Sequence, residues 1–220
     1  MDYSKLKTLG KSVSKFVVGM EGNISEKKDN SFYIKSSGSY LNNLDDSDFV
    51  CYDFFGNQLN NFEKKGSLEI EFHKYLLGFD FVNFVCHTHP TNTLKILCTN
   101  YANEFSERRL FPDQVVFNGK KSCLIPYKKP GKELFDSLKN KLNEFIKQEN
   151  FFPKLILLQN HGIISCGRTI EECIIVSEIC EKSAEIFLES ITLKNVNYLT
   201  DNEINDILND ENEKYRKSLI

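Results

Sequence analysis

Two histidines stand two residues apart in the segment FVCHTHPTNT, residues 84–93, of a chain that has four histidines in all. His87 and His89 follow an apolar, β-branched run that predicts a buried strand. Because residues i and i+2 of a strand point to the same face, we expect the two imidazoles side by side. Neutral imidazoles so placed can share a metal ion, although two histidines lining a polar cleft would give the same pattern.

A third histidine lies where another apolar segment is interrupted. His161 stands in LQNHGII, where a polar, glycine-containing turn divides a buried strand pair. Such a break can bring its side chain close to the end of another strand, and three imidazoles with one open position is the arrangement of a catalytic zinc ion. The fourth histidine, His73, falls on the predicted helix EIEFHKYL, and we expect a structural role for it.

Carboxylates and glycine turns in other segments suggest further roles. Glu69 and Glu71 lie on the predicted helix before the HTH strand, and Glu69 is close to the helix N-terminus, where the helix dipole favours a carboxylate. A carboxylate near a metal ion but not bound to it can serve as a general base, whereas helix periodicity alone predicts an ordinary solvated glutamate. GNIS and KSSG combine glycine with small polar side chains, which can form anion pockets but are common in turns.

The elements that must position these residues intermix strands and helices, which predicts a layered α/β domain. Strands are expected at SFYIKSS, DFVCYDFFG, VNFVCHTH and QVVF, and as a pair in LILLQNHGIISCG. Helices are expected over residues 2–18, 67–79, 92–105, 132–150 and 169–193, with Ser67 and Thr169 as N-caps of the second and the last. The polar tail from Asn195 is expected to end in a short helix. Because we find no repeat or linker, we expect a single domain over residues 1–220.

Composition argues against several classes of function. The 220 residues carry 28 basic and 31 acidic side chains, well mixed along the chain, so nothing points to nucleic acid or an anionic membrane as a partner. No apolar run approaches the roughly 20 residues of a membrane span and the N-terminus lacks an apolar signal core, so we expect a cytoplasmic protein. The seven cysteines form no CxxC motif, which favours small buried apolar residues over disulfides or a thiolate zinc site.

Taken in order, six segments resemble the class II aldolase/adducin family, and in particular its zinc-dependent sugar aldolases of the fuculose-phosphate and rhamnulose-phosphate type. They are GNIS (22–25), KSSG (35–38), SLEIEFH (67–73), HTHP (87–90), IPYKKPG (125–131) and NHGII (160–164). The resemblance extends from about Gly22 to about Glu189. It implies a three-layer αβα sandwich around a mixed, largely antiparallel sheet, and a homotetramer.

The resemblance also implies a reaction and the residues that perform it. The reaction is cleavage or formation of a C–C bond in a ketose or sugar phosphate, through an enediolate stabilised by one zinc ion, or another divalent ion, per subunit. The implied metal ligands are His87, His89 and His161, with Glu69 as catalytic acid/base. The implied phosphate-binding residues are Asn23, Ser37, Gly38 and Ser67, and Tyr215 is a candidate to reach a neighbouring subunit. The expected partner is a small carbohydrate.

Two departures from the family pattern bear on the substrate. The family's phosphate aldolases carry two adjacent serines before the glutamate, whereas Leu68 follows Ser67 here, and Glu21 would repel a phosphate dianion unless it points away or is paired. The same metal site could serve an epimerase, a decarboxylase or a dehydratase, because they share the fold. An adducin-like interaction domain is a further alternative, but it predicts missing ligands, and all three histidines and the glutamate are present.

Overall fold

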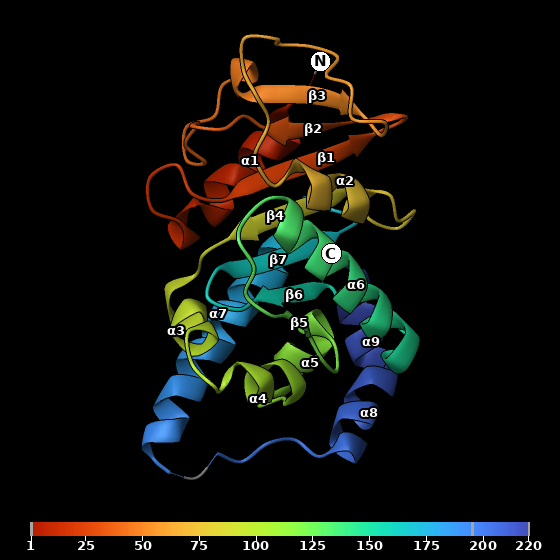
Figure 1. Cartoon of the computed structure of the whole chain (residues 1–220). Coiled ribbons are helices and arrows are strands. Elements are labelled where there is room, and N and C mark those ends of the chain that lie inside the picture. Colours follow the sequence, from red (N-terminus) through yellow and green to blue (C-terminus); the bar gives the residue numbers. More distant parts are fainter. Residues whose placement is uncertain (1, 195, 220) are drawn as a thin grey trace.

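A computed structural model describes residues 2–194 and 196–219, so that Asn195 lies outside the described part of the chain. Within that part, seven strands form one sheet in the order β3-β2-β1-β4-β7-β6-β5 (Figure 1). The strands are β1 (Asn23–Lys28), β2 (Ser31–Lys35), β3 (Phe49–Asp53), β4 (Phe84–Thr88), β5 (Cys123–Ile125), β6 (Leu155–Leu158) and β7 (Gly162–Gly167). Neighbouring strands are antiparallel except for the parallel pair β5 and β6, which confirms a mixed, largely antiparallel sheet.

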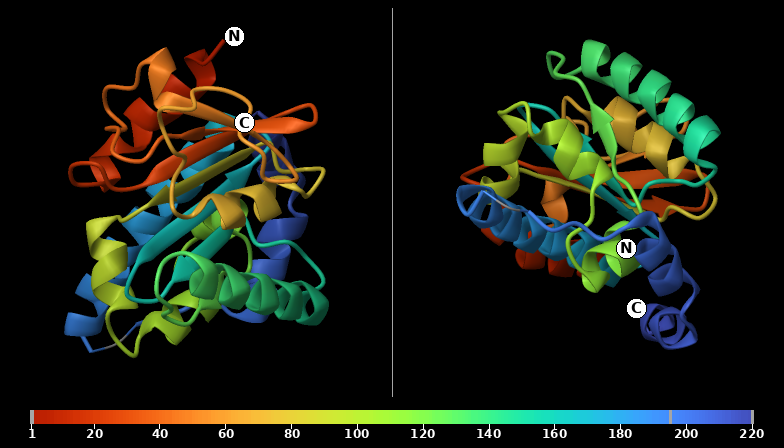
Figure 2. Two further views of the ribbon diagram at one scale, coloured as in Figure 1. Left: turned by 45° about the horizontal axis from the view of Figure 1, so that its top comes forward. Right: turned by 90° about the horizontal axis from the view of Figure 1, so that it is seen from below.

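Helices cover both faces of this sheet, which confirms the predicted αβα layers. Figure 2 shows α2 and α6 on one side of the sheet and α1 and α7 on the other. The α-helices are α1 (Ser4–Val13), α2 (Ile70–Leu77), α3 (Thr91–Leu97), α4 (Ala102–Glu107), α5 (Pro112–Asn118), α6 (Lys132–Glu149), α7 (Ile170–Thr192), α8 (Asp201–Asn209) and α9 (Glu211–Ser218). The polar tail thus forms two helices, α8 and α9. None of the described helices has the length and apolar character needed to cross a membrane.

Strand alternation divides the hydrophobic core between the two faces. Val85 of β4 packs in one cluster with Leu76 of α2 and Leu138 of α6, whereas Cys86, the next residue, packs in another with Leu9 of α1. Burying one such leucine contributes about 1.5–3 kcal/mol relative to leaving it exposed. Because alternate residues of β4 share a face, the residue two positions after Val85 also points toward the layer that contains α2.

The long helix α7 begins as its sequence predicts. The Thr169 side chain accepts a hydrogen bond from the Glu172 backbone N–H at 3.1 Å, which confirms the predicted N-cap. A cap of this kind typically stabilises a helix by about 1 kcal/mol. Six of the seven cysteines are buried and Cys98 is exposed, in line with the expectation of small buried apolar residues.

Two predicted elements are wrong. QVVF forms the body of α5 rather than a strand, because Pro112 occupies the first helical position and Asp113 the first turn, and both favour helix initiation. The predicted helix over residues 92–105 is divided into α3 and α4 by a turn in which Thr99 Oγ1 accepts from the Tyr101 backbone N–H at 3.1 Å.

Two further local features differ from the sequence-based expectations. Helix α2 begins at Ile70 with Glu69 as its N-cap, so Ser67 does not cap it; instead the Ser67 hydroxyl accepts from the Glu69 backbone N–H at 3.2 Å. The segment after Gly22, where the sequence predicted no strand, forms β1, and the short β5 was also not predicted. Strand β1 matters most for function, because Asn23 pairs directly with His87 in the sheet.

Candidate metal centre

The structure brings three of the four histidines together at one end of the sheet. His87 is in β4, His89 directly follows the last residue of that strand, and His161 lies in the turn before β7. The antiparallel pairing of Thr88 with Ile163 places the end of β4 beside the start of β7. One ring nitrogen of each histidine lies within 4.8 Å of those of the other two. The structure therefore brings together the three side chains that the sequence predicted to lie close to one another.

Glycine allows the two strands to approach closely enough for this clustering. A Cβ atom at Gly162 would lie 2.4 Å from the Thr88 carbonyl oxygen and 2.6 Å from Cδ2 of His89. Any other residue after His161 would therefore push β7 away from β4. Gly22 allows a similar close approach on the other side of β4, where β1 pairs with it. Its φ is +71°, and a Cβ atom there would lie 2.8 Å from the His87 carbonyl oxygen.

The ring nitrogens have the spacing and the proton arrangement that a metal ion requires. Nε2 of His87 is 3.0 Å from Nε2 of His89, and two ligands of a tetrahedral zinc ion lie roughly 3.3–3.4 Å apart. The His87 Nδ1–H donates to the Ile163 carbonyl oxygen at 2.8 Å, so its Nε2 lone pair faces the other histidines. Oε2 of Glu21 lies 3.4 Å from Nδ1 of His89, where a carboxylate favours a proton on Nδ1 and a free Nε2.

Burial keeps all three imidazoles neutral. Desolvation lowers the pKa of His87 to about 4, opposed in part by the hydrogen bond to Ile163. It also lowers the pKa of His89 and of His161 to about 4, and the nearby His87 adds to both shifts. Metal coordination needs deprotonated imidazole, so the three side chains are in the right protonation state at neutral pH.

Glu69 faces this cluster with one carboxylate oxygen unpartnered. Its Oε2 is 3.3 Å from Nε2 of His87 and its Oε1 is 3.4 Å from Nε2 of His161. Asn23 Nδ2 donates to Oε2 at 2.9 Å, whereas Oε1 is buried and has no hydrogen-bond partner among the described residues. A buried carboxylate oxygen beside neutral imidazoles is costly unless a cation lies close to it. The donor set therefore fits a divalent metal ion.

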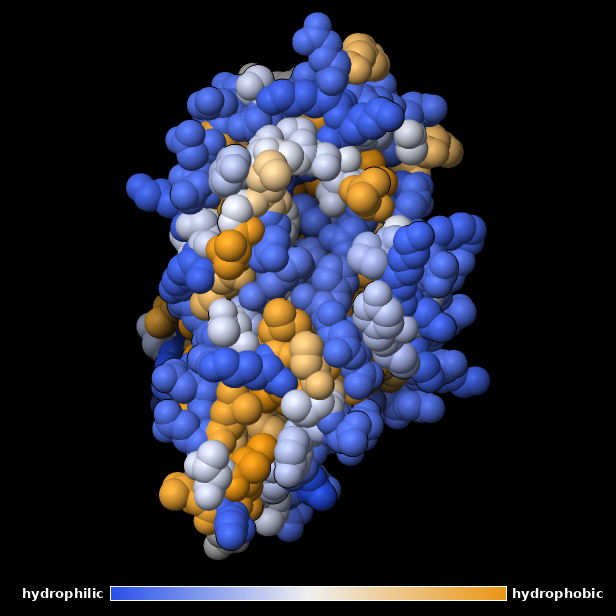
Figure 3. Space-filling view, turned by 60° about the vertical axis from the view of Figure 1, so that its left-hand side comes forward, coloured by the Kyte–Doolittle hydropathy of each residue, from blue (hydrophilic) through white to orange (hydrophobic). Residues whose placement is uncertain are grey.

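Residues predicted to bind phosphate line a polar pocket of about 200 Å³ in front of the histidines. The view in Figure 3 brings this end of the sheet forward and shows hydrophilic surface at its centre, flanked by apolar patches. The predicted residues that line the pocket are Asn23, Ser37, Gly38 and Ser67. Leu68, which follows Ser67, also lines it and is 80% exposed.

Lys35 and His73 contribute to the site, although the sequence predicted no role for Lys35 and only a structural role for His73. Lys35 is buried against the pocket, and its ammonium donates to the Ser39 carbonyl oxygen at 2.7 Å. Desolvation lowers the pKa of Lys35 to about 8. Because Lys35 is the first residue of the KSSG segment, the sequence could have indicated a basic side chain beside the predicted anion pocket. His73 lies outside the histidine cluster, but its Nε2 forms a hydrogen bond with Asn23. Its position four residues after Glu69, about one helical turn, was the sequence feature that could have indicated that the two side chains lie on the same face of the helix.

Two other expectations concern Glu21 and Tyr215. Glu21 is paired rather than directed at a phosphate, because its Oε2 accepts from the Val18 backbone N–H at 2.9 Å and lies beside His89. Tyr215 is 68% exposed on α9, and among the described residues that line the pocket none belongs to α9. The structure of one chain therefore does not bring Tyr215 to the histidines.

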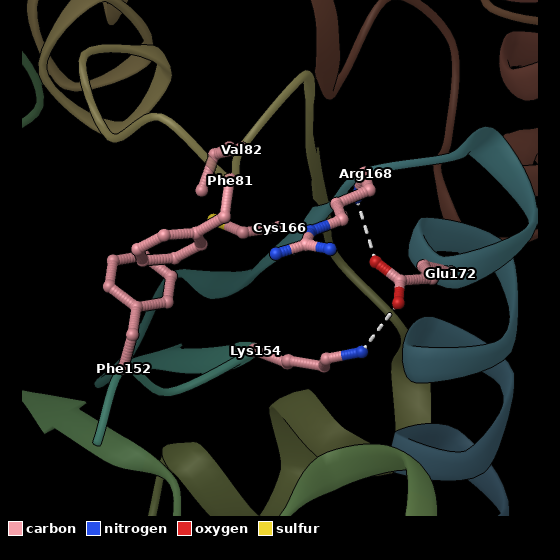
Figure 4. A pocket seen from close by; sticks show the side chains of 8 residues that line it. Phe81, Val82, Phe152, Lys154, Cys166, Arg168 and Glu172 are labelled. Atoms are coloured by element: carbon pink, nitrogen blue, oxygen red, sulfur yellow. Dashed lines mark hydrogen bonds and ion pairs between the residues drawn. The ribbon is translucent and has the colours of Figure 1, made fainter. Parts of the chain in front are cut away.

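A cavity of about 310 Å³ at the opposite end of β4 and β7 lacks this chemistry (Figure 4). Phe81 and Phe152 form an apolar wall. Beside it Lys154 pairs with Glu172 at 2.7 Å, the Arg168 backbone N–H donates to the same carboxylate at 2.7 Å, and no histidine among the described residues lines the cavity. We therefore place the candidate active site at the histidine cluster.

The sequence matches the profile of the class II aldolase and adducin N-terminal domain over residues 12–188, and the chain belongs to that family. Family and histidine cluster together define a class II aldolase superfamily enzyme with a histidine-triad metal site. The L-fuculose phosphate aldolase of Methanococcus maripaludis strain C7 is 29% identical over 174 residues, 78% of this chain and 87% of that protein.

The proteins similar to this chain do not all bear the same name. The 3-oxo-tetronate 4-phosphate decarboxylase of Escherichia coli strain K12 is 27% identical over 194 residues, which are 87% of either chain. A solved structure of an L-fuculose 1-phosphate aldolase superposes with a TM-score of 0.78 at 21% identity, over 96% of this chain and 94% of that one. At this identity the likeness shows a shared fold.

Proposed function

We propose that this protein is a zinc-dependent aldolase that cleaves or forms a C–C bond of a ketose or sugar phosphate. His87, His89 and His161 are the proposed metal ligands and Glu69 the proposed catalytic acid/base. The observation that carries the proposal is the convergence of three neutral imidazoles on a buried carboxylate with one unpartnered oxygen. The aldolase relatives support this reaction class.

Glu69 is placed to move a proton at the carbon beside the substrate carbonyl. When bound, the metal ion supplies Lewis acidity that draws electron density from that carbonyl. Oε1 of Glu69 can then accept a proton from the donor carbon, leaving an enediolate, while Asn23 holds Oε2 at 2.9 Å. In the cleavage direction, the hydroxyl group that becomes the aldehyde oxygen loses its proton as the C–C bond breaks, and the carboxyl group of Glu69 delivers a proton to the donor carbon, so that one proton moves from oxygen to carbon overall.

A phosphate group matches the chemistry of the pocket rim. Gly38 has a φ of +87° in an open turn, where a Cβ would meet no atom closer than 4.0 Å, so backbone N–H groups of the turn can approach an anion. Ser37 and Ser67 add hydroxyl donors and Asn23 an amide. Lys35 adds positive charge, because a group with a pKa of about 8 is mostly protonated at pH 7. Glu21, engaged with His89, does not oppose the phosphate directly.

We extend the proposal to the assembly by family resemblance: one domain per chain over residues 1–220 and a homotetramer. Tyr215 is exposed on α9, away from the pocket of its own chain, so any role at a metal centre would be at that of a neighbouring subunit. The molecular mass measured by sedimentation tests the assembly, and a monomer would remove the basis for a role of Tyr215.

Decarboxylation of a sugar-acid phosphate is the second candidate. It is favoured by the similarity to the 3-oxo-tetronate 4-phosphate decarboxylase, which covers 87% of the chain. Loss of CO2 beside a carbonyl group also leaves an enediolate-type anion, so the same residues could serve it. An epimerase or a dehydratase would make similar demands on the site.

The deciding experiment is hydrogen–deuterium exchange at the donor carbon of dihydroxyacetone phosphate in heavy water, followed by NMR. Zinc-replete protein is expected to catalyse exchange, a chelator to stop it, and Glu69→Gln to lower the rate roughly 10²–10⁴-fold while retaining zinc. Glutamine keeps the size of Glu69 but cannot take the proton. No exchange by zinc-replete protein would count against the aldolase and shift weight to the decarboxylase. Exchange by Glu69→Gln at the normal rate would overturn the role of Glu69.

A further inference from the structure

His73 and Ser25 form a hydrogen-bonded pair behind the candidate catalytic carboxylate. His73 lies on α2, one turn after Glu69, is fully buried, and stacks on Phe72 with ring centroids 4.7 Å apart. Its Nδ1 is 2.6 Å from Ser25 Oγ, and its Nε2 forms a short hydrogen bond with Asn23 Oδ1. Asn23 and Ser25 are alternate residues of β1, so both point from the same face of the sheet toward α2.

These hydrogen bonds form a series that ends at the carboxylate of Glu69, and that carboxylate determines which atom donates in each bond. An ionised carboxylate only accepts hydrogen bonds, so Asn23 must present an amide N–H to Oε2 of Glu69 at 2.9 Å. The amide nitrogen also donates to Ser67 Oγ at 3.0 Å. The amide oxygen of Asn23 must therefore face His73.

The tautomer of His73 is determined by the same argument. Burial lowers the pKa of His73 well below its usual value, so the ring is neutral and carries one N–H. Because Asn23 Oδ1 is an acceptor, that N–H is at Nε2, and Nδ1 accepts from the Ser25 hydroxyl. The order of donors thus runs from Ser25 through His73 and Asn23 to Glu69.

We propose that His73 is a positioning residue whose Nε2–H fixes the Asn23 carboxamide with its N–H groups toward the pocket, so that Asn23 holds the Glu69 carboxylate in place. Ser25 secures the tautomer. This inference rests on the proposed function of Glu69. Among the described residues, His73 is the hydrogen-bond donor to Asn23 Oδ1. If the carboxamide turned over, Oδ1 would face Oε2 of Glu69, and two acceptors would repel each other.

A matched pair of substitutions at His73 separates the effect of its hydrogen bond to Asn23 from the effect of its packing. His73→Leu fills the space without a donor, whereas His73→Gln places an amide N–H near the position of Nε2. In the donor-exchange assay His73→Leu is expected to lower the maximal rate roughly 10–100-fold, because a misplaced base loses alignment, with little change in donor affinity. His73→Gln is expected to recover much of the rate, and both variants to retain the wild-type zinc content. Equal rates for the two variants would overturn the proposal.

A control variant and a double variant test whether His73 acts through Asn23. Leu76→Val alters an equally buried side chain of the same helix that makes no polar contact, and is expected to leave the rate unchanged. Asn23→Ala combined with His73→Leu is expected to be no slower than Asn23→Ala alone. If the two losses multiply in full, His73 acts independently of Asn23 and the proposal fails.

An NMR measurement on the wild-type protein keeps this inference separate from the proposed function. The nitrogen shifts of His73 at pH 7 are expected to report a proton on Nε2 and none on Nδ1, whether or not any substrate reacts. A proton on Nδ1 alone would require the Asn23 carboxamide to face the other way and would overturn the proposal. Absence of donor exchange in wild-type protein, with the expected tautomer present, would instead count against the aldolase function.

Discussion

Replacing His87 with glutamine should flatten the pH dependence of stability in acid. His87 is fully buried, and desolvation lowers its pKa to about 4 from 6.5. Between these two values the unfolded chain binds a proton that the folded protein does not, so stability rises with pH. The contribution is fully present above about pH 6.5 and is lost as the pH falls toward 4. Glutamine, which has no titrating proton in this range, removes the effect.

The size of the effect follows from the two pKa values. At pH 5 nearly all unfolded chains carry the His87 proton, whereas about one folded molecule in ten does. Integrating that difference from pH 8 to pH 5 gives a loss of about 2 kcal/mol for this one imidazole. The substitution also makes protonation of the neighbouring His89 and His161 easier, because a charged His87 lowers their pKa values, so it flattens the curve further.

Urea unfolding at pH 8 and pH 5 in the presence of a chelator measures this difference. The chelator is needed because metal binding would itself compete with protons for the imidazoles. We expect wild-type protein to lose at least about 2 kcal/mol more than His87→Gln between the two pH values, with equal denaturant slopes. Val85→Ala, at a fully buried position of the same strand, is the control and should destabilise the protein equally at both.

One result would refute the reasoning. If His87→Gln lost as much stability as the wild type between pH 8 and pH 5, the imidazole of His87 would titrate alike in the folded and unfolded protein. The desolvation argument, and with it the claim that burial prepares neutral ligands for a metal ion, would then be wrong.

Two further substitutions test the construction of the metal centre. His161→Ala should weaken zinc binding by about two to three powers of ten, because roughly 10–16 kcal/mol shared among four ligands is about 2.5–4 kcal/mol each. Competition with a chromophoric chelator measures the change. A dissociation constant within about tenfold of the wild type would contradict the ligand assignment. Gly162→Ala should both destabilise the fold and weaken zinc binding, because its Cβ would lie 2.4 Å from the Thr88 carbonyl oxygen. Urea unfolding and the same competition assay measure the two effects. Unchanged zinc affinity would show that zinc binding does not require the close approach of β7 to β4.

The periodic pattern of apolar residues was sufficient to predict the type of those elements that bury a regular apolar face. The amphipathic helix α6 and the strands β4, β6 and β7 have the predicted type because their apolar residues repeat with the period of a helix or a strand. Strand β1 was missed because Glu26, Lys27 and Lys28 suggest solvated surface, although Glu26 is buried and paired with Lys28 at 2.8 Å. Helix α5 was misassigned because a short apolar run fits either period, and its neighbours Pro112 and Asp113 decided the outcome.

The sequence by itself determined the chemical groups of this site. Two histidines at strand spacing and a third before a glycine make His87, His89 and His161 candidates for one cluster, and the family resemblance assigns them as metal ligands and adds Glu69. These inferences depend on side-chain type and on the two-residue period of a strand, both of which are local properties.

Only the tertiary structure decided how these groups are held. The register that pairs Asn23 with His87, and the packing of α2 on the face of the sheet that carries them, bring Glu69, Asn23 and His73 into one hydrogen-bonded chain. Residues 46 and 50 positions apart meet in it. No local preference specifies such contacts, because they depend on which strands become neighbours, in what register, and on which face a helix settles.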